Sequence, residues 1–275
     1  MFRSEDAGNT WSVVTIATQE PLFGIDFVNG RTGWIVGRKG LVFRTDDAGK
    51  TWIKQNTDME DHLFAVSFLD ERQGLAVGNF GVVLRTEDGG ATWKSSVLEA
   101  MSSASIYGVQ MFDGGVAYLV GEYPTWEAEL EEDVAATTLS SFFRSADGGV
   151  TWERAAMPDT SHLFDLAFED ANAGYVAGTK GLVLRTDDGG ATWTRVAADT
   201  PFHLVKIRQV GDGFAAVGNA GAAVVSDGGS ATSVATGAYF WLSSLDFSSK
   251  GRGVLVGHHG LITISEDGGR SWRKP

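Results

Sequence analysis

A repeated octapeptide is the feature that most limits how this chain can fold. Six segments fit the pattern Ser/Thr-x-Asp-x-Gly-x-Thr/Ser-Trp, which we call the Asp box, and they end at Trp11, Trp52, Trp93, Trp152, Trp193 and Trp272. Successive tryptophans are 41, 41, 59, 41 and 79 residues apart. A seventh segment, Ser226-Asp227-Gly228-Gly229, lacks the tryptophan. A period of about 41 residues indicates one supersecondary unit copied along the chain.

Each unit has the pattern of four short strands, which we name A to D. In the second unit, Leu63–Phe68 alternates as strand A, Gly74–Gly78 forms strand B and Val82–Thr86 forms strand C. The Asp box follows, and Trp93 opens strand D. Four-stranded units of this length are propeller blades, which must stack on neighbours to bury both faces. The sequence therefore predicts an all-β propeller of four-stranded antiparallel blades.

Strands B and C are joined by a Gly-x-x-Gly turn in five units. The glycine pairs are Gly37 and Gly40, Gly78 and Gly81, Gly178 and Gly181, Gly218 and Gly221, and Gly257 and Gly260. A short hairpin needs positive φ, and we expect these glycines to supply it.

The number of blades depends on how the chain starts. Complete A–B–C sets begin near Leu22, Leu63, Ile106, Leu163, Leu204 and Trp241, whereas Met1-Phe2-Arg3-Ser4 aligns with the C strand Val42-Phe43-Arg44-Thr45. We expect one domain over residues 1–275 with seven blade positions, one of them incomplete because upstream strands A and B were lost or the start is placed late. The alternative is six blades, with Trp11–Ile16 pairing beside Ile262–Ser265.

The repeated acids and arginines are interpreted as structural. The carboxylate of Asp88 can accept N–H bonds across its turn, Gly90 permits a left-handed backbone, and Trp93 is expected between blades. One catalytic site does not need seven copies of an aspartate. Five arginines share one repeat position and are likewise assigned to blade structure, namely Arg3, Arg44, Arg85, Arg144 and Arg185.

Composition excludes several classes of function. With no cysteine, the chain has no disulfide and no thiolate metal site. Its net charge of −13 argues against nucleic acid and anionic membranes as partners. No apolar run is long enough for a transmembrane helix. Residues 1–6 do not have the pattern of a signal peptide, and we expect an extracytoplasmic location only if an upstream signal is missing.

The face opposite the Asp boxes is predicted to bind a partner. The third unit has about 18 extra residues, at 122–141 between strands B and C, where Thr125 can cap a helix. That helix either contacts a partner or packs onto the propeller. The B–C turn tips vary between units, which suits partner recognition on a rigid frame. The predicted partner-binding residues are Arg38, Lys39, Phe80, Tyr123, Trp126, Glu127, Glu131, Lys180, His258 and His259.

Three histidines precede strand A or lie close to that place, and we expect them at the mouth of the channel. They are His62, His162 and His203. Three histidines could bind a metal ion. We favour the interpretation that each is a repeat-inherited residue bonding the neighbouring loop, and we predict no metal site and no cofactor.

The repeat resembles a known family. The pattern Leu-Phe-x-Ile/Val/Leu-x-Phe, then Gly33–Gly37 and Leu41–Trp52, is similar to the photosystem II assembly and stability factors, which are seven-bladed propellers. The resemblance implies a non-catalytic factor that binds a membrane-protein precursor. The family's working surface is basic whereas this chain is acidic, so we expect a non-photosynthetic bacterial relative.

A binding scaffold is the leading functional hypothesis. It predicts a monomer that presents its loop-rich face to a protein partner, such as a membrane-protein complex. The alternative is a glycoside hydrolase of the Asp-box, sialidase-like kind, which needs paired carboxylates. Only Glu127, Glu131 and Asp133 are candidates for these. A metal-dependent enzyme is the third hypothesis.

Overall fold

A computed structural model describes residues 1–122, 141–159 and 161–275. These residues form antiparallel strands and short 3₁₀ turns, with no α-helix among them. No helix in this part of the chain is long and apolar enough to cross a membrane. The chain divides into two compact units, which are described separately. The first contains residues 1–4 and 11–155, and the second contains residues 5–10 and 156–275.

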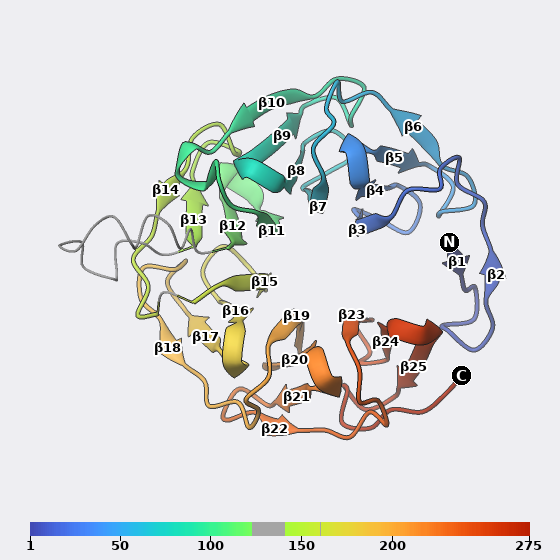
Figure 1. Cartoon of the computed structure of the whole chain (residues 1–275), viewed down its shortest axis with the longest axis vertical. Coiled ribbons are helices and arrows are strands. Elements are labelled where there is room, and N and C mark those ends of the chain that lie inside the picture. Colours follow the sequence, from blue (N-terminus) through green and yellow to red (C-terminus); the bar gives the residue numbers. More distant parts are fainter. Residues whose placement is uncertain (123–140, 160) are drawn as a thin grey trace. The chain divides into compact units, whose positions relative to one another are not determined.

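The first unit contains one two-stranded and three four-stranded sheets (Figure 1). The strands of these four sheets, in order, are β1 (Phe2–Arg3) and β2 (Ser12–Val13); β3 (Leu22–Phe27), β4 (Gly33–Gly37), β5 (Val42–Thr45) and β6 (Ile53–Gln55); β7 (Leu63–Phe68), β8 (Gly74–Gly78), β9 (Val82–Thr86) and β10 (Lys94–Val97); and β11 (Ile106–Met111), β12 (Ala117–Gly121), β13 (Phe142–Ser145) and β14 (Glu153–Arg154). In each four-stranded sheet, neighbouring strands along the chain pair antiparallel.

The second unit contains two four-stranded sheets and one three-stranded sheet. Its strands are β15 (Leu163–Phe168), β16 (Gly174–Gly178), β17 (Val183–Thr186) and β18 (Thr194–Arg195); β19 (Leu204–Val210), β20 (Gly213–Gly218), β21 (Ala223–Ser226) and β22 (Thr232–Ser233); and β23 (Leu242–Phe247), β24 (Gly253–Gly257) and β25 (Leu261–Ser265). A single antiparallel bridge between Ile264 and Arg273 stands where the last sheet would have strand D.

The described residues form six blades of a β-propeller, so the six-blade alternative is confirmed and the seventh blade position is not. The strands Phe2–Arg3 and Ser12–Val13 form a separate two-stranded sheet. The pairing expected with the six-blade alternative is wrong in detail, because Ser12–Val13 pairs with Phe2–Arg3 and Ile264 pairs with Arg273. The strands predicted in the second unit of the repeat match β7, β8 and β9 residue for residue.

A β-bulge near the start of strand A recurs in all six blades. In β7 the register shifts between Leu63 and Ala65. A bulge adds one residue on one strand and so changes which side chains share a face. Leu63, Val66 and Phe68 consequently all join one core cluster, although strict alternation would separate Leu63 from the other two.

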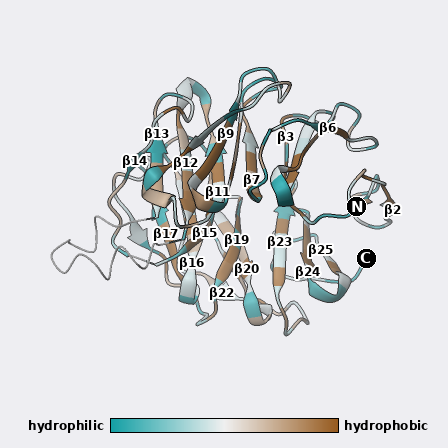
Figure 2. Cartoon of the chain, turned by 45° about the horizontal axis from the view of Figure 1, so that its top comes forward, coloured by the Kyte–Doolittle hydropathy of each residue, from teal (hydrophilic) through white to brown (hydrophobic). Residues whose placement is uncertain are grey.

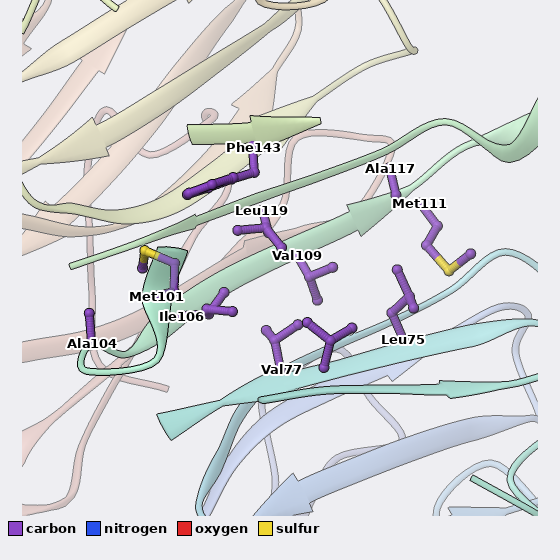
Figure 3. Close-up of a cluster of buried hydrophobic side chains, with 11 residues drawn as sticks. Leu75, Val77, Met101, Ala104, Ile106, Val109, Met111, Ala117, Leu119 and Phe143 are labelled. Carbon is purple, nitrogen blue, oxygen red and sulfur yellow. The ribbon is translucent and has the colours of Figure 1, made fainter. Parts of the chain in front are cut away.

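Within each unit, the core consists of apolar layers between successive blades. One layer joins the second and third blades of the first unit, where Leu75 and Val77 of β8 meet Val109 and Met111 of β11 (Figure 3). Apolar residues concentrate in the strands and hydrophilic residues in the turns (Figure 2). Each blade therefore depends on its neighbour to bury its faces, as the repeat predicted.

The Asp boxes are self-contained turns, as the sequence indicated. Oδ1 of Asp88 accepts from the backbone N–H of Thr92 at 2.8 Å, and Oδ2 accepts from its hydroxyl at 2.6 Å. These hydrogen bonds to Thr92 lower the pKa of Asp88 to about 2. Gly90 has φ +89°, and Trp93 meets Phe68 edge to face in an inter-blade cluster.

Three of the arginines before the boxes connect blades. Arg44 lies over the ring of Trp34 and donates from Nη1 to the carbonyl of Gly89, in the Asp box of the next blade, at 3.1 Å. Arg85 donates to the carbonyl of Gly148 at 3.0 Å in the same way. Arg3 donates to the equivalent carbonyl of Ala48 at 2.8 Å. These three contacts support the structural interpretation, and we call the contact the arginine clasp. Arg185 instead pairs with Asp187 of its own box at 2.8 Å.

Candidate functional site

The B–C turns and the D–A connections lie on one face of each unit, which we call the turn face. Asn79 of a B–C turn donates its N–H to the carbonyl of His62 in the D–A connection at 3.0 Å. The Asp boxes lie with the A–B turns on the other face, since Gly89 donates its N–H to the carbonyl of Arg72 at 2.8 Å. This separation of the two loop sets agrees with the sequence prediction.

The tips of the turn face hold non-glycine residues in the left-handed region. Lys39, Phe80, Lys180 and His259 have φ between +53° and +57°, and each precedes a left-handed glycine. Such backbone is uncommon for side chains larger than asparagine. Four of the predicted partner-binding residues therefore occupy strained positions from which they project.

The prediction about the turn glycines was half right. The second glycine of each pair has positive φ, for example Gly81 at +68°, but the first is extended, with φ −165° at Gly78. The first position excludes a side chain for another reason. A Cβ on Gly78 would overlap the carbonyl oxygen of His62, so the turn and the D–A connection can approach only without one.

Three aromatic rings form a ladder across the first residues of successive A strands in the first unit. Phe23, Phe64 and Tyr107 follow one another with ring centroids 5.4 Å apart at both steps. Phe23 is exposed and the other two rings are half-buried. Offset rings at this separation attract each other and form a rigid apolar surface.

The last ring of the ladder is held by an acid. Tyr107 donates its hydroxyl to Oε1 of Glu122 at 3.0 Å, and Glu122 also accepts from the N–H of Ser105 at 3.1 Å. Burial, followed by the charge of Glu122, raises the pKa of Tyr107 to about 12. These bonds anchor Glu122, the first residue of the insertion, to the start of strand A.

The two cations of the first turn share one acid. Lys39 donates from Nζ to Oε1 of Glu20 at 2.5 Å, and Nε of Arg38 lies 3.9 Å from the same carboxylate. The hydrogen bond from Lys39 lowers the pKa of Glu20. The shared carboxylate weakens the attraction that these two cations would otherwise exert on an anion. Phe80 of the next turn is apolar and 56% exposed.

The three histidines use their backbone in the same way. The carbonyls of His62, His162 and His203 accept the N–H of Asn79, Thr179 and Asn219, respectively. This supports the interpretation that they bond the neighbouring loop. The side chain of His203 also bonds a turn, because its Nδ1 accepts the N–H of Lys180 at 3.1 Å. In the described ranges, no group of three or more His, Asp or Glu residues could hold a metal ion.

The second unit has its own aromatic cluster on the turn face. His258 stacks on Trp241 with centroids 6.3 Å apart, and His259 meets Phe240 edge to face at 5.2 Å. Tyr239, beside them in sequence, is 91% exposed. The predicted residues His258 and His259 are thus brought together with Trp241 and Phe240 of the preceding D–A connection.

A buried polar network ties two A strands of the second unit. Asp165, which is buried, accepts from Nζ of Lys206 at 3.1 Å, from Nη1 of Arg208 at 2.9 Å and from the N–H of Ile207 at 3.0 Å. Burial, and then the charge of Arg208, lowers the pKa of Lys206. The network satisfies a buried carboxylate, which would otherwise be costly.

Four predicted site residues fall outside the described part of the chain, namely Tyr123, Trp126, Glu127 and Glu131. The insertion does lie between strands B and C, because β12 ends at Gly121 and β13 begins at Phe142.

The aromatic ladder and the cluster around Trp241 were missed by the sequence analysis, although both have a sequence signal. An aromatic residue follows Leu or Ile at the start of four A strands, and Tyr239-Phe240-Trp241 is an unusual run of aromatic residues. The aromatic residues at the start of the A strands were interpreted as part of the alternating strand pattern. That their rings meet follows only from the bulge and from the packing of neighbouring A strands.

Comparisons with known proteins agree with this architecture. The structure is similar to one described as YCF48 bound to D1 peptide, with a TM-score of 0.69 and 20% identity over 95% of this chain and 84% of that one. It is also similar to YCF48 from Cyanidioschyzon merolae, with a TM-score of 0.72 and 20% identity over 95% of this chain and 87% of that one.

A third similar structure is the Niastella koreensis GH74 enzyme, with a TM-score of 0.73 and 14% identity over 95% of this chain but only 46% of that one. At these identities the likeness shows the propeller fold alone. No curated protein matches the sequence. The family model for the photosynthesis system II assembly factor YCF48 matches residues 3–149 and 143–233. The chain therefore belongs to the YCF48 family of photosynthesis system II assembly factors.

Proposed function

We propose that this protein is a non-catalytic scaffold that binds an exposed segment of a protein partner on its turn face. The observation that carries the proposal is the aromatic ladder of Phe23, Phe64 and Tyr107, at the start of the A strands. Rigid aromatic side chains supply large contact area at little cost in side-chain entropy, and they dominate binding hot spots. A solved family member described as YCF48 bound to D1 peptide supports a peptide-like ligand.

The partner is proposed to be a membrane protein during its assembly, bound through a loop or terminus that lies outside the lipid. The family description, an assembly factor, supports this choice. The net charge of −13 opposes binding to anionic lipid itself. The protein is proposed to act as a monomer, and light scattering after gel filtration should give a mass near 29.3 kDa.

The first experiment measures peptide binding by fluorescence anisotropy, with a labelled D1 peptide as the probe. Phe23→Ala combined with Phe64→Ala should weaken binding at least tenfold, because both changes remove ring surface from the ladder. Ile53→Ala is the matched control, since Ile53 is an exposed apolar residue on the outer strand of the first blade. Unchanged affinity in the ladder variant, with far-UV circular dichroism preserved, would refute the assignment to the ladder.

The insertion is proposed to contribute to the same binding surface. Deleting residues 123–138 should leave the midpoint of thermal unfolding nearly unchanged and abolish recovery of the partner. The acids suggested for a glycosidase, Glu127, Glu131 and Asp133, lie in this segment. Incubation of the full chain with xyloglucan should release no reducing sugar, and release that the deletion abolishes would favour the enzyme alternative.

A further inference from the structure

The connections that lead into the A strands of the first unit are acidic. Residues 14–21, 56–62 and 98–105 contain five acids and no lysine or arginine. These acids are Glu20, Asp58, Glu60, Asp61 and Glu99. The equivalent connections within the second unit, residues 196–203 and 234–241, contain a single acid. The acids are therefore not inherited with the repeat, and blade structure does not account for them.

Four of the five carboxylates have no cationic partner. Glu20 pairs with Lys39, whereas the other four form no salt bridge with any residue that the structure describes. Three of these four side chains are exposed and that of Asp61 is half-buried. We call these four residues the unpaired acids. Charges of one sign on a protein surface attract segments of the opposite sign and repel those of the same sign.

Two of the unpaired acids line a pocket. Asp58 and Glu60 lie on its wall together with Lys39 and Lys54, and its volume is about 340 Å³. Lys39 is already held by Glu20, so the pocket offers two carboxylates for one cation, Lys54, that forms no salt bridge in the described part of the chain. A hydrogen bond between a carboxylate and a lysine or arginine is strong, so the pocket favours a basic side chain.

The acidic connection at 56–62 is fixed in place and leads directly to the aromatic ladder. Thr57 donates its hydroxyl to the carbonyl of Gly40 at 2.8 Å, and Gly40 donates its N–H to the carbonyl of Asp61 at 2.7 Å. Phe64, the middle ring of the ladder, follows three residues after Asp61 on β7, which lies between β3 and β11 (Figure 1). The carboxylates and the rings are therefore held together on one preorganised surface.

We propose that the aromatic ladder and the unpaired acids together bind a basic segment of the partner protein that carries two apolar side chains. This inference rests on the proposed function, because it specifies the chemistry of the segment that the ladder binds. Two steps of 5.4 Å place the outer rings at most about 11 Å apart, which an extended chain spans in about three residues. Apolar side chains at positions i and i+2 therefore lie on the rings, and the lysines or arginines that flank them reach the carboxylates.

Charge decides between this occupant and two others. A second copy of the chain would place one set of unpaired acids against another, and like charges facing each other oppose association. An acidic segment is repelled for the same reason. A basic segment gains charge-assisted hydrogen bonds to the carboxylates in addition to the apolar contact with the rings.

The test measures the binding of four fluorescein-labelled peptides to the full chain by fluorescence anisotropy. The basic peptide is Lys-Arg-Phe-Ser-Leu-Arg-Lys. The neutral and acidic peptides have glutamine or glutamate at the four basic positions, and the fourth peptide keeps the basic residues but has alanine in place of phenylalanine and leucine.

We expect the basic peptide to bind at least tenfold more tightly than each of the other three. Raising the salt concentration from 50 to 500 mM should weaken the binding of the basic peptide but not that of the neutral one, because salt screens exposed charges. Absence of binding by the basic peptide, or equal binding by the neutral one, would overturn the inference. Equal binding by the alanine peptide would also overturn it, since charge alone would then account for the affinity.

A charge-neutral variant of the pocket tests the carboxylates directly. Asp58→Asn combined with Glu60→Gln should weaken binding of the basic peptide at least fivefold and leave binding of the neutral peptide unchanged. Asparagine suits position 58, where φ is +49°. Asp113→Asn combined with Glu153→Gln is the matched control, since it removes two exposed acids of the same unit outside these connections. Equal affinities of the two variants for the basic peptide would contradict the assignment.

The ladder variant separates this inference from the proposed function. If Phe23→Ala with Phe64→Ala weakens binding of the D1 peptide while the basic and neutral peptides bind equally, the ladder binds a partner and only the preference for a basic segment is refuted. If that variant binds the basic peptide as tightly as the unchanged chain, the acids act without the ladder and the inference is overturned, whereas the D1 peptide still decides the proposed function.

Discussion

Removing one arginine clasp should destabilise the propeller by an amount that the geometry allows us to work out. In Arg44→Ala, the carbonyl of Gly89 loses a charged donor at 3.1 Å, and the ring of Trp34 loses a guanidinium 5.2 Å from its centroid. A hydrogen bond to a charged group contributes roughly 1.5–3 kcal/mol, and an exposed cation–π contact contributes about 0.5–1 kcal/mol.

The lower part of that range applies, because the acceptor keeps other partners. The carbonyl of Gly89 also accepts from Nε1 of Trp34 and from Nε2 of Gln55, both at 3.0 Å, so no buried group is left unsatisfied. We expect a loss of about 2 kcal/mol for Arg44→Ala. Arg44→Lys keeps the charge but not the planar fork, and it should lose about half as much.

Equilibrium unfolding in urea, followed by tryptophan fluorescence and circular dichroism, measures these losses through the midpoint at constant slope. Lys54→Ala is the matched control, since Lys54 is an exposed cation of the same sheet and should change stability by less than about 0.5 kcal/mol. The clasp would be shown to contribute nothing if Arg44→Ala and Lys54→Ala unfolded at the same urea concentration.

Three further predictions follow from the turns and the ladder. The lowered pKa of Asp88 means that its contribution to the free energy of unfolding is complete above about pH 4 and lost as the pH falls toward 2, so Asp88→Asn should flatten the acid branch of a stability–pH curve. Gly78→Ala should lower the midpoint of thermal unfolding, because the added Cβ would overlap the carbonyl of His62. Phe80→Gly should leave that midpoint unchanged or raise it, because relief of about 1–2 kcal/mol of left-handed strain offsets the added entropy of the unfolded chain. Equal midpoints for the two variants would contradict this account. Ultraviolet titration should show one tyrosine ionising near pH 12, and its absence from the Tyr107→Phe titration would confirm the assignment, whereas persistence would refute it.

Local patterns predicted the strands well, because each is a short apolar run between turn residues. The bounds of β7, β8 and β9 and the fold of the Asp box at Asp88 were all readable from the sequence. The role of Arg3, Arg44 and Arg85 also followed, since a residue repeated at one position of successive blades serves what those blades share.

Contacts between strands could not be read in this way. The aromatic ladder depends on how far the ring of Phe23 reaches toward Phe64, and these residues are separated by a whole blade in sequence. The extended conformation of Gly78 was missed because its requirement comes from the carbonyl of His62, on a different connection. The blade count depended on the pairing of Phe2–Arg3 with Ser12–Val13, which a pattern of alternation does not specify.

The arginine clasp points in one direction along the chain, and this has a consequence for synthesis on the ribosome. Arg3 and Arg44 each find their acceptor 45 residues later, and Arg85 finds its acceptor 63 residues later because the insertion intervenes. Each of these three arginines is therefore synthesised before its carbonyl acceptor in the next Asp box. Each of these contacts can form only after the next Asp box has been synthesised. The delay is longest for Arg85, because the insertion lengthens the third unit of the repeat.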